Sequence, residues 1–210
     1  MAQARRGRPS TGVREAVLQA TEEVLGDAGL ALSTKEIARR AGVAESSVFY
    51  HFGDRLGLLQ AVIGLHLPAF ADATAVLGEH RDERDGGQED GGLPAELTAL
   101  LTHLERFYRR IMPILGALQA DAQLRALLAE RGGDIGPHLA LRAVADALRA
   151  RQAAGRLPAG LDPAAAALLL VGAAHQRALH THLLGEAAAR FLPPVEALAR
   201  TLLPAFEQPR

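Results

Sequence analysis

The chain has 210 residues, of which 49% are hydrophobic and 4% aromatic, and its formal net charge is −1. The apolar content comes mostly from Ala and Leu, which favours helices packed on helices over sandwiches or barrels. The chain has no Cys, which excludes disulfides, Cys-ligated zinc and thiol chemistry. No apolar run approaches the length of a membrane span, and no signal-peptide core follows the N-terminal arginines. We therefore expect an all-α cytoplasmic protein without a membrane segment.

Residues 1–12 form a basic arm. Arg5, Arg6, Arg8 and Arg14 all precede the first acidic residue, Glu15, and the arm also contains a Gly and a Pro that disfavour a helix. The near-zero net charge gives no overall argument for nucleic-acid binding, but a local cationic arm suits DNA phosphates. The alternative is a solubilising tail without a binding role.

Three amphipathic segments follow the arm. Apolar residues recur at helical spacing over residues 13–28. Ser33 and Glu36 form a capping-box pattern that opens a short second helix. Gly42 ends that helix, and a third helix is expected over residues 45–52. Two short helices joined at a glycine predict a helix-turn-helix.

Two runs of residues within these segments carry a family resemblance: Thr34-Lys35-Glu36-Ile37-Ala38-Arg39-Arg40-Ala41-Gly42-Val43 and Ser46-Ser47-Val48-Phe49-Tyr50-His51-Phe52. They resemble the DNA-binding signature of the TetR family, and the resemblance covers about residues 13–63. It implies an all-α fold of about nine helices. A three-helix DNA-binding domain would occupy residues 13–53, and a larger helical ligand-binding and dimerisation domain would occupy residues 54–210.

The resemblance also implies a function. We expect a repressor that binds a palindromic operator as a homodimer and is released by a small, mainly apolar effector. Phosphate contacts would position the protein, and base contacts would give specificity. The residues implied to approach base edges are Lys35, Glu45, Ser46, Ser47 and Phe49. Those implied to hold phosphates are Thr34, Tyr50, His51 and Arg55, together with the basic arm.

Three positions depart from the family pattern. Ala44 stands where the family usually has Ser, so the third helix lacks a side-chain cap. Phe49 replaces the usual Tyr, and both Phe49 and Phe52 have an alternative interpretation as core residues. Arg55 replaces the usual Lys directly after the expected helix cap Asp54, which keeps a phosphate donor at this position.

The rest of the chain is also expected to be helical. A connecting helix is expected from Asp54 to about Leu77, with a kink at Pro68, and residues 79–93 are expected to form a solvated loop. Asp162 is expected to cap a long Ala-rich helix. Helical periodicity occurs over residues 94–111, 113–118, 122–131, 136–152, 162–184 and 194–206.

The last two of these helices are expected to form a four-helix bundle with their copies in a homodimer. The alternative is a purely intramolecular core. The expected interface residues are Leu168, Val171, Ala178, Val195, Leu198, Leu202 and Phe206.

The interior of the second domain is the expected effector site. Apolar residues there would be joined by a few polar anchors, and each of them has the alternative role of a simple core residue. The expected lining is Leu104, Phe107, Tyr108, Met112, His138, Leu141 and His175. His175, His180 and His182 do not share a helix face with a carboxylate at metal-ligand spacing, so we expect no metal or other cofactor.

Two other classes of function stay open at this point. A helical enzyme would need a catalytic constellation, but the sequence has no nucleophile elbow, phosphate loop or paired-carboxylate motif. A helical adaptor that has lost its DNA contacts is motivated by Ala44, by Phe49 and by the near-neutral charge.

Overall fold

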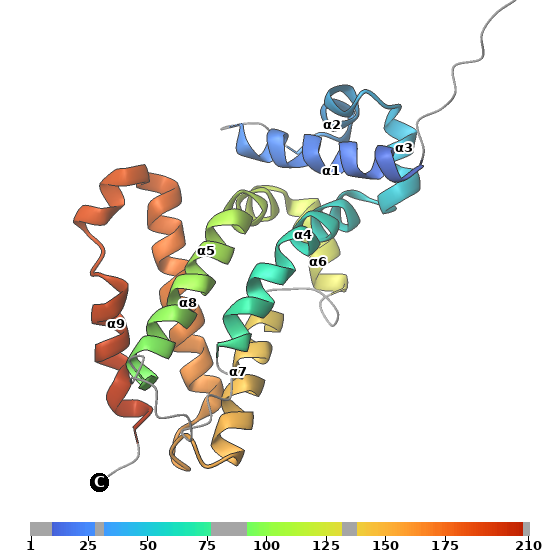
Figure 1. Ribbon diagram of the computed structural model, residues 1–210. Helices are drawn as coiled ribbons and strands as arrows, with labels where there is room; N and C mark the ends of the chain where they lie inside the picture. Colours follow the sequence, from blue (N-terminus) through green and yellow to red (C-terminus); the bar gives the residue numbers. More distant parts are fainter. Residues whose placement is uncertain (1–9, 28–31, 77–91, 132–137, 208–210) are drawn as a thin grey trace, which may run out of the picture. The chain divides into compact units, whose positions relative to one another are not determined.

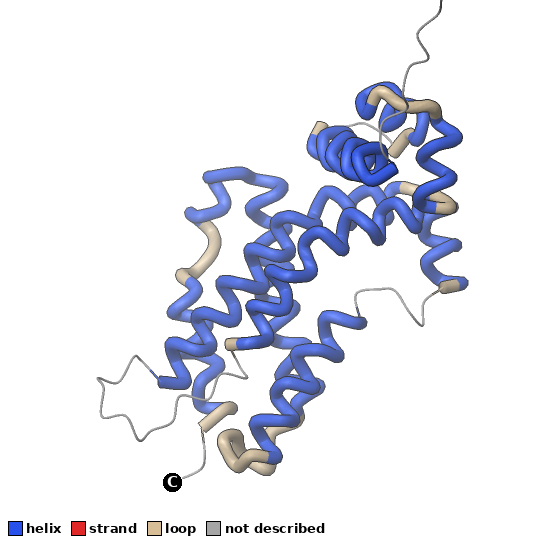
Figure 2. The backbone as a smooth tube through the Cα atoms, turned by 45° about the vertical axis from the view of Figure 1, so that its right-hand side comes forward, coloured by secondary structure: helices blue, strands red, loops and turns tan. Residues whose placement is uncertain are grey.

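The computed structural model describes residues 10–27, 32–76, 92–131 and 138–207, and these residues form helices without any strand (Figures 1 and 2). The predicted all-α fold of about nine helices is thereby confirmed. The described α-helices are α1 (Ser10–Gly26), α2 (Thr34–Ala41), α3 (Glu45–Phe52), α4 (Arg55–Ala75), α5 (Gly92–Ala120), α6 (Ala122–Glu130), α7 (His138–Ala153), α8 (Pro163–Leu184) and α9 (Val195–Leu202). Two 3₁₀ helices, η1 (Gly185–Arg190) and η2 (Leu203–Ala205), flank α9.

The chain divides into two compact units. Unit 1 contains Met1–Leu65 and Pro113–Asp134, and unit 2 contains His66–Met112 and Ile135–Arg210. The domain boundary expected after residue 53 falls inside unit 1. The first turns of α4 belong to this unit because they bury Leu58 and Leu59 completely and because their first residue is ion-paired to Asp121.

Unit 1 is built around α1, which contacts both α2 and α3. Val17 and Val24 of α1 and Ile37 of α2 are fully buried, and Val48 of α3 is 1% exposed. Helices of eight residues are marginal in isolation, so burial against α1 stabilises α2 and α3. This arrangement is the predicted helix-turn-helix, with α1 beginning and ending a few residues earlier than expected.

The turn between α2 and α3 follows from local chemistry. The Ser33 hydroxyl accepts a hydrogen bond from the Glu36 amide at 3.4 Å, as its capping role predicts. The reciprocal half of a capping box is not formed, because the Glu36 carboxylate accepts hydrogen bonds from Arg39 and Arg40 instead. Gly42 ends α2 with φ of 68°, a left-handed conformation that glycine adopts without a steric penalty.

The junction between α3 and α4 is tight. Asp54 caps α4, since its Oδ1 accepts a hydrogen bond from the Gly57 amide at 2.8 Å. A Cβ atom added at Gly57 would lie 2.1 Å from the carbonyl oxygen of Phe52, the last residue of α3. Glycine at position 57 therefore sets how closely the end of α3 approaches α4.

We expect Gly57→Ala to lower the free energy of unfolding by about 1–3 kcal/mol, because the added methyl group must displace backbone at the α3–α4 junction. The measurement is chemical denaturation followed by circular dichroism. Gly64→Ala is the matched control on the same helix. A Cβ atom added at Gly64 would have nothing within 4 Å, so this change should raise the free energy of unfolding by about 0.5–1 kcal/mol. Equal effects of the two substitutions would contradict the close approach at Gly57.

Unit 2 contains the first part of α5, together with α7, α8, η1 and α9. Leu97, Leu100, Leu101 and Leu104 of α5 are fully buried, and α7 packs along α8. Asp162 caps α8 as predicted, because its Oδ1 accepts hydrogen bonds from the first amides of the helix. None of the helices in the described ranges is long and apolar enough to span a membrane.

A buried ion pair connects distant parts of unit 2. Glu105 of α5 and Arg177 of α8 lie 2.6 Å apart, with side chains 11% and 14% exposed. Arg177 also donates a hydrogen bond to the Pro193 carbonyl, so one guanidinium joins α5, α8 and the segment before α9.

Several sequence boundaries differ from the expectation. The segments expected on either side of Pro113 form one continuous helix, α5, and α4 likewise continues through Pro68. The expected loop at residues 79–93 lies outside the described residues, except that residues 92–93 begin α5. Residues 1–9 of the basic arm, including Arg5, Arg6 and Arg8, also lie outside them, whereas residues 10–12 begin α1.

Candidate nucleic-acid interface

Helix α3 has an exposed face. Val48 is the one residue of this helix that is buried. Tyr50 is 85% exposed and Phe49 is 45% exposed, and Ser46 is also exposed. The alternative interpretation of Phe49 as a core residue is therefore wrong, whereas Phe52 is half-buried. The outward face presents hydroxyl groups and aromatic rings, which are able to meet polar base edges and phosphates.

The N-terminus of α3 has no side-chain cap. Ala44 has the extended conformation of an N-cap residue, with φ of −72° and ψ of 145°, but its methyl group accepts no hydrogen bond. The first contact of the helix is instead made by the backbone, where the Ser47 amide donates to the Ala44 carbonyl at 2.9 Å. The prediction of a missing cap is confirmed.

Two of the predicted contact residues bind each other. The Thr34 hydroxyl donates to Glu45 Oε1 at 2.5 Å, and Thr34 is 8% exposed. This hydrogen bond ties the first residue of α2 to the first residue of α3. Thr34 and Glu45 thus hold the two helices in position in the absence of DNA.

The charges on α2 are unevenly compensated. Hydrogen bonds from Arg39 and then Arg40 lower the pKa of Glu36 to about 2, so its carboxylate is ionised throughout the physiological range. Arg40 also pairs with Asp27 at 2.6 Å. Lys35, in contrast, is exposed in the first turn of α2. Lys35 is accordingly the α2 cation best placed to meet a DNA phosphate or base.

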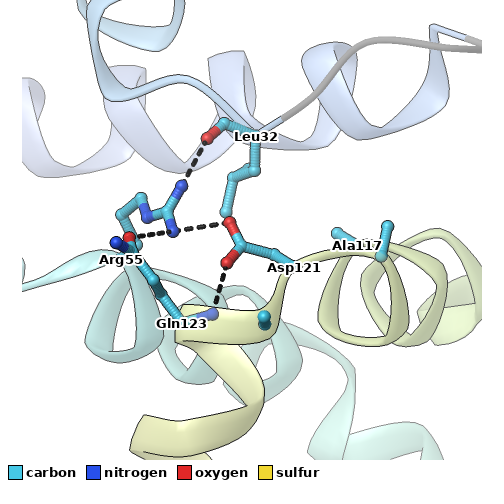
Figure 3. Close-up of a pocket in the computed structure, with 7 residues that line it drawn as sticks. Leu32, Arg55, Ala117, Asp121 and Gln123 are labelled. Carbon is cyan, nitrogen blue, oxygen red and sulfur yellow. Dashed lines mark hydrogen bonds and ion pairs between the residues drawn. The ribbon is translucent and has the colours of Figure 1, made fainter.

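Arg55, which was expected to hold a phosphate, is engaged within unit 1 (Figure 3). Its guanidinium donates to Asp121 Oδ2 at 2.5 Å and to the Leu32 carbonyl at 3.3 Å. These groups line an open hollow of about 430 Å³, whose lining residues are Leu32, Arg55, Ala117, Ala120, Asp121, Ala122 and Gln123.

An arginine that the sequence analysis counts among the N-terminal basic residues, but not among the DNA contacts, lies near α3. Arg14 is exposed on α1, and its guanidinium carbon lies 5.5 Å from the centroid of the Phe52 ring. Such a cation–π contact orients the guanidinium at the end of α3. The two residues are far apart in the sequence and no motif links them, so only the fold reveals the contact.

His51 and Tyr50 form an edge-to-face pair, with ring centroids 5.2 Å apart. His51 is half-buried, and its ring also lies 6.3 Å from Phe52. The structure places Lys35 on α2 and Ser46, Ser47, Phe49, Tyr50 and His51 on α3, and these two helices contact each other.

The residues expected to bind an effector are mostly core residues of unit 2. Leu104, Phe107, Tyr108 and Met112 are buried, and the rings of Tyr108 and His175 lie 5.3 Å apart. Burial raises the pKa of Tyr108 to about 12, so its hydroxyl keeps its proton. Leu141 is half-buried. His138 is exposed at the start of α7 and does not join this group.

The residues expected at the dimer interface differ in exposure within the single chain. Val171, Ala178 and Phe206 are buried by the chain's own residues, at 6%, 0% and 3% exposure. Leu168 is 60% exposed. The remaining members, Val195, Leu198 and Leu202, are half-buried on α9.

We expect Ala44→Ser to raise the free energy of unfolding by about 1 kcal/mol, because its hydroxyl would accept a hydrogen bond from a free amide at the start of α3. Thermal and chemical denaturation measure the change. The reverse control is Ser33→Ala, which removes the cap of α2 and should cost a similar amount. A neutral or destabilising Ala44→Ser would show that α3 has no room for the cap.

The comparison with known proteins places this geometry among transcription regulators. Residues 17–62 match the family described as "Bacterial regulatory proteins, tetR family". A stretch of 52 residues, 24% of this chain, is 44% identical to the HTH-type transcriptional repressor BepR of Brucella suis biovar 1 (strain 1330). The chain matches about a quarter of the length of this curated relative.

Solved structures are similar over nearly the whole chain. The TetR-family transcriptional regulator from Pectobacterium atrosepticum is 21% identical with a TM-score of 0.57, covering 98% of this chain and 100% of that one. The SmeT–triclosan complex, whose SmeT comes from Stenotrophomonas maltophilia, is 23% identical with a TM-score of 0.62, covering 93% and 92%. Salmonella enterica GusR is 19% identical with a TM-score of 0.62, covering 95% and 97%. At these identities the likeness establishes the fold.

Proposed function

The chain belongs to the TetR family of bacterial regulatory proteins, and from this premise we propose that it is a repressor that binds a palindromic operator as a homodimer and is released by a small, mainly apolar molecule. The observation that carries the proposal is the exposed face of α3. This face lies within the part of the chain that matches the family and that resembles a known repressor.

The DNA contact follows from the division of roles in unit 1. Val48 holds α3 against the core, which leaves Ser46, Ser47 and Phe49 free to approach base edges in a major groove. Tyr50 and His51, next to them, would hold phosphates. Lys35 adds a cation from α2. Phosphate contacts would fix the register of the helix, and the base contacts would give specificity.

A homodimer accounts for a palindromic operator, because a two-fold protein matches two half-sites about 34 Å apart. Exposed apolar residues on α8 support this part of the proposal. Leu168 and Leu169 are each 60% exposed and Leu183 is 70% exposed, although they belong to a helix whose other face is buried. Contact with a second copy of the chain would remove these side chains from water.

The proposed effector would be recognised in unit 2. Phe70 and Phe107 lie 5.1 Å apart, and the Tyr108 hydroxyl and the His175 ring supply polar groups beside an apolar interior. The similar structure of SmeT contains triclosan, an effector-sized molecule, which supports a ligand of this general kind here. Effector binding would then change the distance between the two α3 helices of the homodimer. This distance would no longer match the spacing of the operator half-sites, and the protein would be released from DNA.

Two alternatives were open from the sequence. The family match favours a regulator over a helical enzyme. The adaptor alternative predicts that the protein binds no DNA even at low salt, so selection of bound sequences from a random DNA library decides between the adaptor and the proposed repressor. A palindromic consensus is the expected result.

We expect Lys35→Ala or Ser47→Ala to reduce discrimination between operator and mismatched DNA by about 1–3 kcal/mol, if each side chain contacts a base. Fluorescence anisotropy on the selected sequence and on single-base variants measures this. Arg149→Ala, an exposed arginine of α7 in unit 2, is the control and should leave both affinities unchanged. Equal weakening on all sequences would assign Lys35 or Ser47 to phosphates instead.

We expect Leu168→Glu combined with Leu169→Glu to convert the dimer to a monomer, because two charges would be buried in the proposed interface. Analytical ultracentrifugation measures the mass. Leu139→Glu is the control, since Leu139 is also apolar and 40% exposed but lies on α7. A wild-type protein that is monomeric, or a dimer that survives both charges, would contradict an interface at α8.

A further inference from the structure

The start of α4 and both ends of α6 are joined by two reciprocal ion pairs, which we call the α4–α6 cluster: Asp54, Arg55, Asp121 and Arg131. Asp54 caps α4 and pairs with Arg131, the residue that ends α6. Asp121 caps α6 and pairs with Arg55, the first residue of α4. Each capping carboxylate is thus bound by an arginine from the other helix.

The pKa of each carboxylate in the cluster is lowered, which favours its ionised form. The amide of Leu124 contributes most to lowering the pKa of Asp121, and the hydrogen bond from Arg55 adds to it. Partial burial favours the neutral form of Asp54, yet hydrogen bonds from the Gly57 amide and from Arg131 outweigh it and lower its pKa. The cluster as a whole therefore carries no net charge at neutral pH.

The pairing of charges matters most for Arg55. Its guanidinium donates hydrogen bonds to Asp121 and to the Leu32 carbonyl, and Gln123 Oε1 lies 3.5 Å from Arg55 Nη2 (Figure 3). Its side chain is nevertheless 26% exposed at the beginning of α4. An arginine in this state presents little positive potential to a phosphate, since the Asp121 carboxylate competes for the same donors.

We propose that Asp121 is an autoinhibitory residue, which lowers the affinity for DNA by holding the guanidinium of Arg55 that a phosphate would otherwise bind. This inference rests on the proposed DNA-binding function. DNA and Asp121 compete for one cation, so the position of α6 sets how many phosphate contacts unit 1 makes. Asp121 is far from α3 in sequence and approaches no base, so it acts through Arg55 alone.

The test is Asp121→Asn, measured by fluorescence anisotropy on the selected operator across a salt series. Asparagine caps a helix as well as aspartate does, so α6 keeps its N-terminal hydrogen bonds while the charge is removed. We expect about three- to tenfold tighter binding at physiological salt. The slope of log K against log salt should also become steeper by about 0.9, the value for one more phosphate contact.

Asp54→Asn is the matched control. It also keeps its helix cap, adds the same unit of charge to the α4–α6 cluster and breaks one α4–α6 ion pair, but it leaves Arg55 bound to Asp121. We expect less than a twofold change in affinity. The double variant Arg55→Gln/Asp121→Asn should lose the gain and bind like Arg55→Gln alone, since no cation is left to be released.

The outcomes separate the two proposals. If the wild type binds DNA and Asp121→Asn binds it equally well or more weakly, autoinhibition is overturned. The proposed function stays intact in that case. An equal gain in Asp54→Asn would also overturn it, because net charge alone would then explain the effect. Absence of DNA binding by the wild type and by Asp121→Asn would overturn both proposals. Circular dichroism checks folding, and Asp121→Ser, which also keeps a capping group, replaces any variant that fails to fold.

Discussion

Burial of one face of α1 against α2 and α3 is the interaction on which unit 1 depends. Two helices of eight residues cannot hold their own shape in water, so their geometry comes from contact with Val17 and Val24. Val48 is the one fully buried residue of α3, so much of the opposite face of that helix is exposed. The same arrangement leaves Ser46, Phe49 and Tyr50 at the surface, on a helix whose N-terminus has no side-chain cap.

Local capping signals in the sequence predicted the starts of three helices, α2, α4 and α8. Ser33, Asp54 and Asp162 each cap the helix that follows them, and the missing cap at Ala44 is also found. These predictions succeed because a cap depends on residues only two or three positions apart. Proline was less informative, since α5 continues through Pro113, where the sequence predicts two separate segments, and α4 is likewise one helix across Pro68. Packing along a long helix evidently outweighs the loss of one backbone hydrogen bond.

Contacts between distant residues could not be predicted in the same way. Arg55 and Asp121 are 66 positions apart, and Glu105 and Arg177 are 72 apart. The resemblance to a family suggested a phosphate contact for Arg55 but gave no sign of its intramolecular partner. Exposure was similarly hard to judge on Ala-rich helices, because α8 is apolar on nearly every face. Its periodicity did not distinguish buried Ala178 from exposed Leu168.

The near-neutral charge of the chain has a local explanation in unit 1. Arg39 and Arg40 are offset by Glu36, and Arg55 is offset by Asp121. Overall charge is therefore a poor guide to DNA binding here, since affinity depends on which cations lack an internal carboxylate partner. Lys35 is exposed, whereas the guanidinium of Arg55 becomes available to a phosphate only when the Asp121 carboxylate releases it. Under the proposed autoinhibition, a movement of α6 that separated Asp121 from Arg55 would add a phosphate contact to unit 1 without any change in α3.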